Sequence, residues 1–132
     1  MGPPDYLAPG LRLKHPSYHG SLPMKARPAP QAMLLSTDAA ERKAMPITSG
    51  VLDYFPLAIA EVAKCSKAGN DQHNPGQPLH WEKSKSTDHA DCIARHLIDR
   101  DSFDTDGIRH AAKLAWRSLA LLQTLLEQEA AA

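Results

Sequence analysis

Apolar residues recur at helical spacing along the last part of the chain, and this pattern constrains the fold more than any other feature. The residues that follow the spacing are Ile108, Ala111, Ala112, Ala115, Leu119, Leu122 and Leu126, with Leu114, Leu121 and Leu125 widening the stripe. The pattern predicts a helix that begins around residues 104–106 and reaches Glu127 or beyond. Because the stripe is wider than one face, this helix is expected to be covered on more than one side. It is therefore predicted to be either the central helix of a bundle or a subunit interface.

Two further helices are predicted upstream. The first begins near Asp53 or Pro56, because proline suits the first helical turn, and ends at Gly69, a favourable C-terminal cap. The second opens at the capping residues 86–88 and runs to about Arg100. Its apolar stripe consists of Ala90, Ile93, Ala94, Leu97 and Ile98. No strand pattern competes, so the sequence predicts an all-α helical bundle.

Proline use divides the chain, since eight of its eleven prolines precede residue 47. Each proline removes a backbone donor and biases the preceding residue toward extended conformations. Residues 1–45 are therefore predicted to be a Pro-rich arm, either disordered or extended over the folded part or a neighbouring subunit. A short helix is expected within Ala32–Met45, which contains good helix formers. Residues 46–132 are predicted to form the all-α domain.

The composition excludes several classes of protein. Basic and acidic residues number 15 each, so the chain lacks the basic excess of a non-specific nucleic-acid binder. Its zero net charge gives little repulsion between copies and therefore favours self-association. Only two cysteines, Cys65 and Cys92, occur, and they are far apart. Without a secretion signal they predict a reduced, cytoplasmic protein. No apolar run approaches the ~20 residues that a membrane span needs, so no membrane partner is expected.

Carboxylates on neighbouring predicted helices suggest a divalent-cation site. Glu61 lies on the first helix, and Asp88 and Asp91 lie three residues apart on one face of the second. If these helices pair, the three side chains supply the oxygen ligands that Mg²⁺ prefers. Asp104 and Asp106, at the start of the last helix, could join them. Taken singly, such a carboxylate is more often a helix cap or one partner of a surface ion pair than a metal ligand.

The linker between the first two helices, residues 69–81, carries more special residues than a turn requires. Its amides, Asn70 and Asn74, can read the edge of a base, and the indole of Trp81 can stack on its face. Long loops punctuated by glycine and proline are often functional. The alternative is a solvated connection in which Trp81 folds back onto the core.

Basic residues near these features are candidates for binding a triphosphate, which needs several cations. The three selected by their position are Lys67, Arg95 and Lys113. The histidines on the predicted helices form no spacing typical of a zinc site and are expected to be structural hydrogen-bonding groups. They are His89, His96 and His110.

Several segments, taken in order, resemble the phage dATP/dGTP diphosphohydrolase family, a group of MazG-like enzymes. The resemblance covers about residues 48–126 and leaves the Pro-rich arm unmatched. It rests on the run Leu52–Lys64, on Lys67-Ala68-Gly69-Asn70, on Asn74 with Trp81, on Arg95-His96, on residues 106–110 and on Trp116–Leu122.

The resemblance implies a MazG-like bundle of the all-α NTP pyrophosphohydrolase type, a homodimer or homotetramer that requires Mg²⁺ or Mn²⁺. Such enzymes cleave a purine (deoxy)nucleoside triphosphate between the α- and β-phosphates. The implied substrate is dGTP, with dATP or GTP as alternatives. Its product, dGMP, would feed 2-aminoadenine nucleotide synthesis in a phage.

Glu61, Asp88 and Asp91 match three positions of the acidic pattern in MazG-like enzymes, but Lys64 stands where a fourth acidic residue is expected. Metal binding is therefore predicted at Glu61, Asp88, Asp91 and Asp106, and catalysis at Glu61 and Asp91. Substrate binding is predicted at Lys67, Asn70, Asn74, Trp81, Arg95 and Lys113. The departure at Lys64 leaves a second class open: a non-catalytic helical nucleotide-binding or regulatory module.

Overall fold

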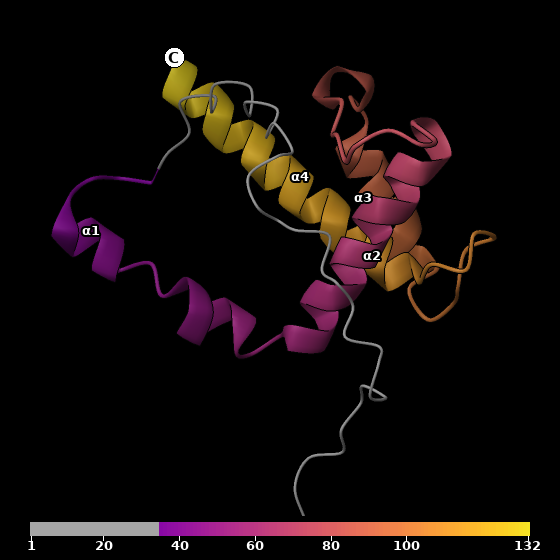
Figure 1. Cartoon of the computed structure of the whole chain (residues 1–132), viewed down its shortest axis with the longest axis horizontal. Helices are drawn as coiled ribbons and strands as arrows, with labels where there is room; N and C mark the ends of the chain where they lie inside the picture. The colour runs from indigo at the N-terminus through magenta and orange to yellow at the C-terminus, as the bar shows by residue number, and fades with distance from the viewer. Residues whose placement is uncertain (1–34) are drawn as a thin grey trace, which may run out of the picture. The chain divides into compact units, whose positions relative to one another are not determined.

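The computed structural model describes residues 35–132 of the chain (Figure 1). Within this range the structure is helical and contains no strand, which confirms the predicted all-α fold. The one extended pairing of the described residues is an isolated antiparallel bridge between Phe103 and Arg109. The predictions made for residues 1–34 of the Pro-rich arm lie outside the described part.

The short helix expected within Ala32–Met45 is α1 (Ala39–Lys43). Asp38 caps it, because its carboxylate accepts a hydrogen bond of 2.9 Å from the backbone N–H of Glu41. After Pro46, a single π-helical turn (Thr48–Leu52) leads toward the next helix.

The first long helix, α2 (Pro56–His73), begins at the proline that the sequence indicated but ends later than predicted. Gly69 was expected to cap it; instead the helix continues through Gly69 for another turn. The helix is capped by Asn74, and Gly76, with φ of 73°, adopts a left-handed conformation in the turn that follows. Asn70 is buried in the last turn and bonded to the linker, and these contacts outweigh the helix-breaking tendency of the preceding glycine.

The second long helix, α3 (His89–Ile98), lies where it was predicted, whereas the last, α4 (His110–Ala131), starts later than residues 104–106. The intervening residues form a loop. Gly107, with φ of 79°, donates its N–H to the Asp104 carbonyl at 2.9 Å, and the Asp104 N–H donates to the Ile108 carbonyl at 2.8 Å. This loop directs the Asp104 and Asp106 side chains toward α4 instead of building them into it.

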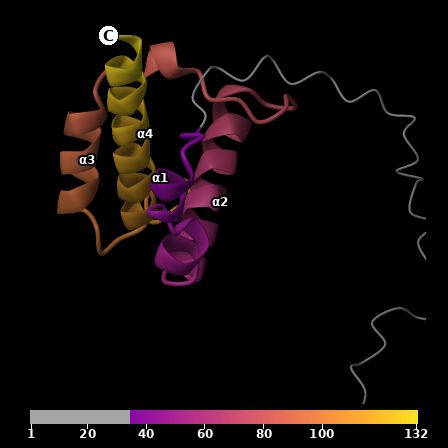
Figure 2. The same ribbon diagram turned by 90° about the vertical axis from the view of Figure 1, so that its left-hand side faces the viewer.

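The helix α4 is the central element of the bundle. Both α2 and α3 pack mainly against it, and Figure 2 shows α4 between them. This confirms the prediction of a central apolar helix. It also corrects the assumption that α2 and α3 pair directly, since each packs mainly on α4.

The core of the described part is small. Its buried apolar residues are Cys92, Ala112 and Ala120. Large apolar side chains on α4 stay uncovered, with Leu119 and Leu122 each 54% exposed and Leu126 45% exposed. Three or four residues separate each from the next, so they share one face of the helix. Among residues 35–132, no helix combines the length and the apolar character that a membrane crossing requires.

Candidate functional site

A cavity of about 500 Å³ opens between the second half of α2, the linker that follows it and the first half of α4. Six residues that the sequence suggested for metal or substrate binding line this cavity. They are Asn70, Asn74, Trp81, Asp104, Asp106 and Lys113. Segments far apart in the chain therefore contribute to one polar site, which we call the α2–α4 cavity.

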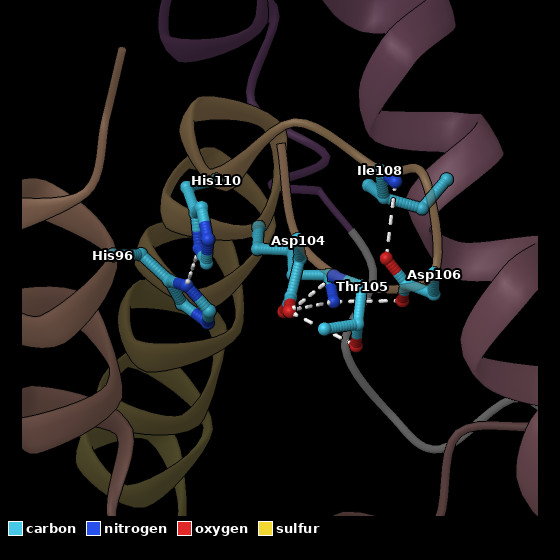
Figure 3. A network of polar contacts seen from close by, with 7 residues as sticks. His96, Asp104, Thr105, Asp106, Ile108 and His110 are labelled. Carbon is cyan, nitrogen blue, oxygen red and sulfur yellow. Dashed lines mark hydrogen bonds and ion pairs between the residues drawn. The ribbon is translucent and has the colours of Figure 1, made fainter. Parts of the chain in front are cut away.

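An ammonium group bridges the two carboxylates at the edge of this cavity. Lys113 Nζ lies 2.6 Å from Asp104 Oδ2 and 2.7 Å from Asp106 Oδ2. The Lys113 side chain is only 20% exposed, so this ion pair is partly shielded from solvent. The loop fixes both carboxylates, because Asp104 also accepts from the Thr105 N–H at 2.7 Å and Asp106 from the Ile108 N–H at 3.0 Å (Figure 3).

These contacts shift the protonation equilibria of all three groups. The hydrogen bond from Lys113, helped by the Thr105 N–H, lowers the pKa of Asp104 from 3.8 to about 2. The same ammonium and the Ile108 N–H lower the pKa of Asp106. Burial works against the charged form of Lys113, but the bonds to both carboxylates prevail and raise its pKa. All three groups are therefore charged near neutral pH.

Two histidines meet beside the acidic loop. His96 Nδ1 of α3 lies 2.9 Å from His110 Nδ1 at the start of α4 (Figure 3). One Nδ1 must carry the proton and the other must accept it. Burial, followed by the nearby His110, lowers the pKa of His96. The pair joins α3 to α4 in the structural manner predicted for these residues.

The linker is fastened to α2 by Asn70, which is 6% exposed. Its side-chain amide donates to the Gln77 carbonyl at 3.1 Å, and its oxygen accepts from the His80 N–H at 3.0 Å. The Asn70 side chain thus positions the linker and has its oxygen engaged. Asn70 and Asn74 both line the cavity, and the substrate contacts predicted for them stay predictions.

The Trp81 indole packs edge-on against Trp116 of α4, with ring centroids 5.5 Å apart. Lys83 Nζ lies 4.9 Å from the centre of the Trp81 ring. The Trp81 Nε1 atom is buried and has no hydrogen-bond partner among the described residues. Trp81 is thus folded onto the core, as the alternative interpretation proposed, while both indoles still line the α2–α4 cavity.

Two of the three carboxylates expected to share a cation, Glu61 and Asp88, are bonded to different partners. Glu61 accepts from Lys64 at 2.8 Å, and this bond lowers the pKa of Glu61. Asp88 accepts from Cys92 and from Arg95, both at 3.4 Å, and its pKa is lowered chiefly by Cys92. No group of three or more His, Cys, Asp or Glu side chains within residues 35–132 could hold a metal ion.

The position of α4 explains why these carboxylates do not converge. Glu61 lies on α2, whereas Asp88 and the exposed Asp91 belong to α3, and the two helices pack on α4. None of the three lines the cavity, although Glu61 precedes the cavity residue Cys65 by one helical turn and Asp88 follows the cavity residue Ser86 by two residues. The roles predicted for Glu61, Asp88 and Asp91 stay predictions.

The cations divide in a similar way. Lys67 pairs with Asp71 on the surface of α2, and Arg95 pairs with Asp88, so neither lines the cavity. Lys113 does, and it is joined by two cations that the sequence reasoning did not select, Lys85 and Arg117. Arg117 follows Lys113 by four residues. That helical spacing was the signal that could have identified it.

The cavity therefore combines indole rings with cationic groups and three carboxylates, those of Glu82, Asp104 and Asp106. This is a donor set suited to a nucleotide, whose base is aromatic and whose phosphates are anionic. The fold and site define a small all-α domain with a nucleotide-compatible pocket.

A family model described as dATP/dGTP diphosphohydrolase, N-terminal, matches residues 32–132. The chain belongs to the dATP/dGTP diphosphohydrolase family. No curated protein and no solved structure matches it.

Proposed function

We propose that the chain hydrolyses a purine deoxynucleoside triphosphate to the monophosphate and pyrophosphate. The observation that carries this proposal is the α2–α4 cavity, in which Trp81 and Trp116 lie with Lys113 and a pair of carboxylates. The family name points to dATP and dGTP as substrates. The preference for dGTP, and a role in supplying 2-aminoadenine nucleotides in a phage, follow from the sequence resemblance.

The proposed cofactor is Mg²⁺ or Mn²⁺. Mg²⁺ in nucleotide enzymes is commonly held by one or two carboxylates together with substrate phosphates. Asp104 and Asp106 fit that donor set, since both line the cavity and are ionised near neutral pH. When bound, such a cation would neutralise phosphate charge and favour attack by water.

The chain's own residues would bind and orient the substrate. The indoles of Trp81 and Trp116 offer an apolar surface for a purine. The Lys113 ammonium, already held between two anions, supplies positive charge where a phosphate chain would enter. Glu61 remains the proposed proton acceptor for the attacking water, a role that rests on the sequence resemblance. Asp91 remains a proposed catalytic carboxylate.

The test is release of pyrophosphate from dGTP and dATP with Mg²⁺ or Mn²⁺. Asp106→Asn, Glu61→Gln and Asp91→Asn are each expected to abolish turnover without changing the helical content. Asp53→Asn, an exposed position outside the cavity, serves as the matched control and should retain full activity. A variant that keeps full activity removes its residue from the site.

The second candidate is a non-catalytic nucleotide-binding module. It is favoured by Lys64 at an acidic position of the pattern and by the lack of a three-ligand metal group within residues 35–132. Absence of pyrophosphate release across the common dNTPs, combined with measurable dGTP binding, would establish this function instead.

We further propose that the chain forms a homodimer or homotetramer. The exposed leucines of α4, notably Leu119, Leu122 and Leu126, form an apolar face that a second copy can bury. A formal net charge of zero adds little repulsion between copies.

A further inference from the structure

Among the lysines and arginines that line the α2–α4 cavity, Arg117 is the half-buried one that forms no ion pair within the described part; Lys85 also forms none but is exposed. Arg117 is half-buried on α4 and lines the cavity, yet none of the carboxylates in residues 35–132 forms an ion pair with it. Lys113, one turn earlier on the same helix, is held by Asp104 and Asp106. A partly buried guanidinium without a counter-ion bears a desolvation cost that an anionic ligand can offset.

A neighbouring histidine holds the guanidinium in place. His89 of α3 is 7% exposed, and its Nδ1 lies 3.3 Å from Arg117 Nη1. A guanidinium can only donate, so Nδ1 of His89 accepts and its ring proton lies on Nε2. One of the five N–H donors of Arg117 is thereby used, and the others stay available for a ligand.

We propose that Arg117 is an anion-binding residue that contacts the phosphate chain of the substrate, with His89 as the residue that positions its guanidinium. The planar fork of N–H donors matches two phosphate oxygens at once. Lys85 lines the same cavity, and Lys113 lies one turn away, so further positive charge borders the site. The identity of the anion as a nucleoside triphosphate rests on the proposed function. The existence of an anion-binding site at Arg117 does not depend on that function.

The probe is inorganic tripolyphosphate, titrated calorimetrically into the metal-free full chain. Because a hydrogen-bonded charge pair contributes about 1.5–3 kcal/mol, Arg117→Gln should weaken binding by about 10- to 100-fold. The matched control is Arg100→Gln. Arg100 is exposed and bonded only to the Leu97 carbonyl within the described part, and its substitution should leave the affinity unchanged.

The positioning role of His89 is tested by two substitutions. His89→Asn keeps a hydrogen-bond acceptor near the position of Nδ1, whereas His89→Leu removes it. Tripolyphosphate affinity should stay within about threefold of wild type in His89→Asn and fall at least tenfold in His89→Leu. In the Arg117→Gln background, His89→Leu should cause no further loss of tripolyphosphate affinity. A general loosening of the fold would instead weaken binding in both backgrounds.

Wild-type affinity for tripolyphosphate in folded Arg117→Gln would overturn the inference, as would failure of wild-type protein to bind it. If Arg117→Gln binds normally while the wild type hydrolyses dGTP, the anion site is wrong and the proposed function stands. If tripolyphosphate binding depends on Arg117 but no deoxynucleotide is hydrolysed, the proposed function is wrong and the anion site stands. Equal affinities in His89→Leu and His89→Asn would remove the positioning role.

Discussion

Replacing Lys113 with methionine should destabilise the fold at neutral pH, because it leaves Asp104 and Asp106 without the cation between them. The pKa of Asp104 falls from 3.8 to about 2 on folding. At 1.36 kcal/mol per pKa unit this corresponds to roughly 2 kcal/mol. Since the side chain is 29% exposed, solvent screening reduces the expected loss in unfolding free energy to about 1–2 kcal/mol.

The pH dependence of this loss has a definite sign. A carboxylate whose pKa is depressed by folding stabilises the protein above its unfolded pKa, and that stabilisation disappears as the pH falls. For Asp104 the window runs from 3.8 down to about 2. The difference in stability between wild type and Lys113→Met should therefore be full at pH 7 and shrink across this window.

Urea denaturation at one protein concentration, followed by tryptophan fluorescence, measures the loss in unfolding free energy and its change with pH. The matched control is Lys67→Met, which removes a pair with Asp71 on the open surface of α2. An exposed pair one turn apart contributes at most about 0.5 kcal/mol. The reasoning is refuted if Lys113→Met unfolds at the wild-type urea concentration at pH 7, or if its deficit is undiminished at pH 2.

Two other variants test the linker and the assembly. Asn70→Ala removes both hydrogen bonds that fasten the linker to α2, and it should lower the free energy of unfolding, measured by urea titration, by about 2 kcal/mol. Asn74→Ala is the control and should lower it much less. Equal losses in the two variants would contradict the role of the Asn70 amide. Leu122→Lys places a charge on the apolar face of α4 and should lower the molar mass measured by light scattering toward the 14.4 kDa of one chain. Leu79 is exposed in the linker, so the control Leu79→Lys should leave the molar mass unchanged. A wild-type mass of one chain would exclude the proposed oligomer.

The sequence predicted the helices well because their apolar residues recur with the period of a helix. The boundaries were less predictable, since they depend on contacts distant in sequence. Gly69 is a residue type that often caps helices, but α2 continues past it because Asn70 is buried against the linker. Aspartates such as Asp104 and Asp106 are common at the start of a helix. Here the turn at Gly107 places them in a loop, which the ion pairs with Lys113 hold against α4.

The candidate site was predicted only in part, for a related reason. Sequence order suggested that consecutive helices pair, which would have joined Glu61 to Asp91. Instead the apolar width of α4 allows it to be covered from two sides, and α2 and α3 pack on it separately. Which cations face the cavity depends on how α4 is rotated about its axis, and the four-residue spacing between Lys113 and Arg117 was the one sequence signal that pointed to Arg117.

The central claim, that the cavity between α2 and α4 binds the nucleotide, is tested most directly by locating the ligand. The measurement is a crystal structure of the chain with Mn²⁺ and a non-hydrolysable α,β-methylene analogue of dGTP. We expect the phosphate chain to lie beside Lys113 and Arg117, with the purine near Trp81 and Trp116. A nucleotide bound instead at the Asp88–Asp91 face of α3, with the cavity empty, would contradict it.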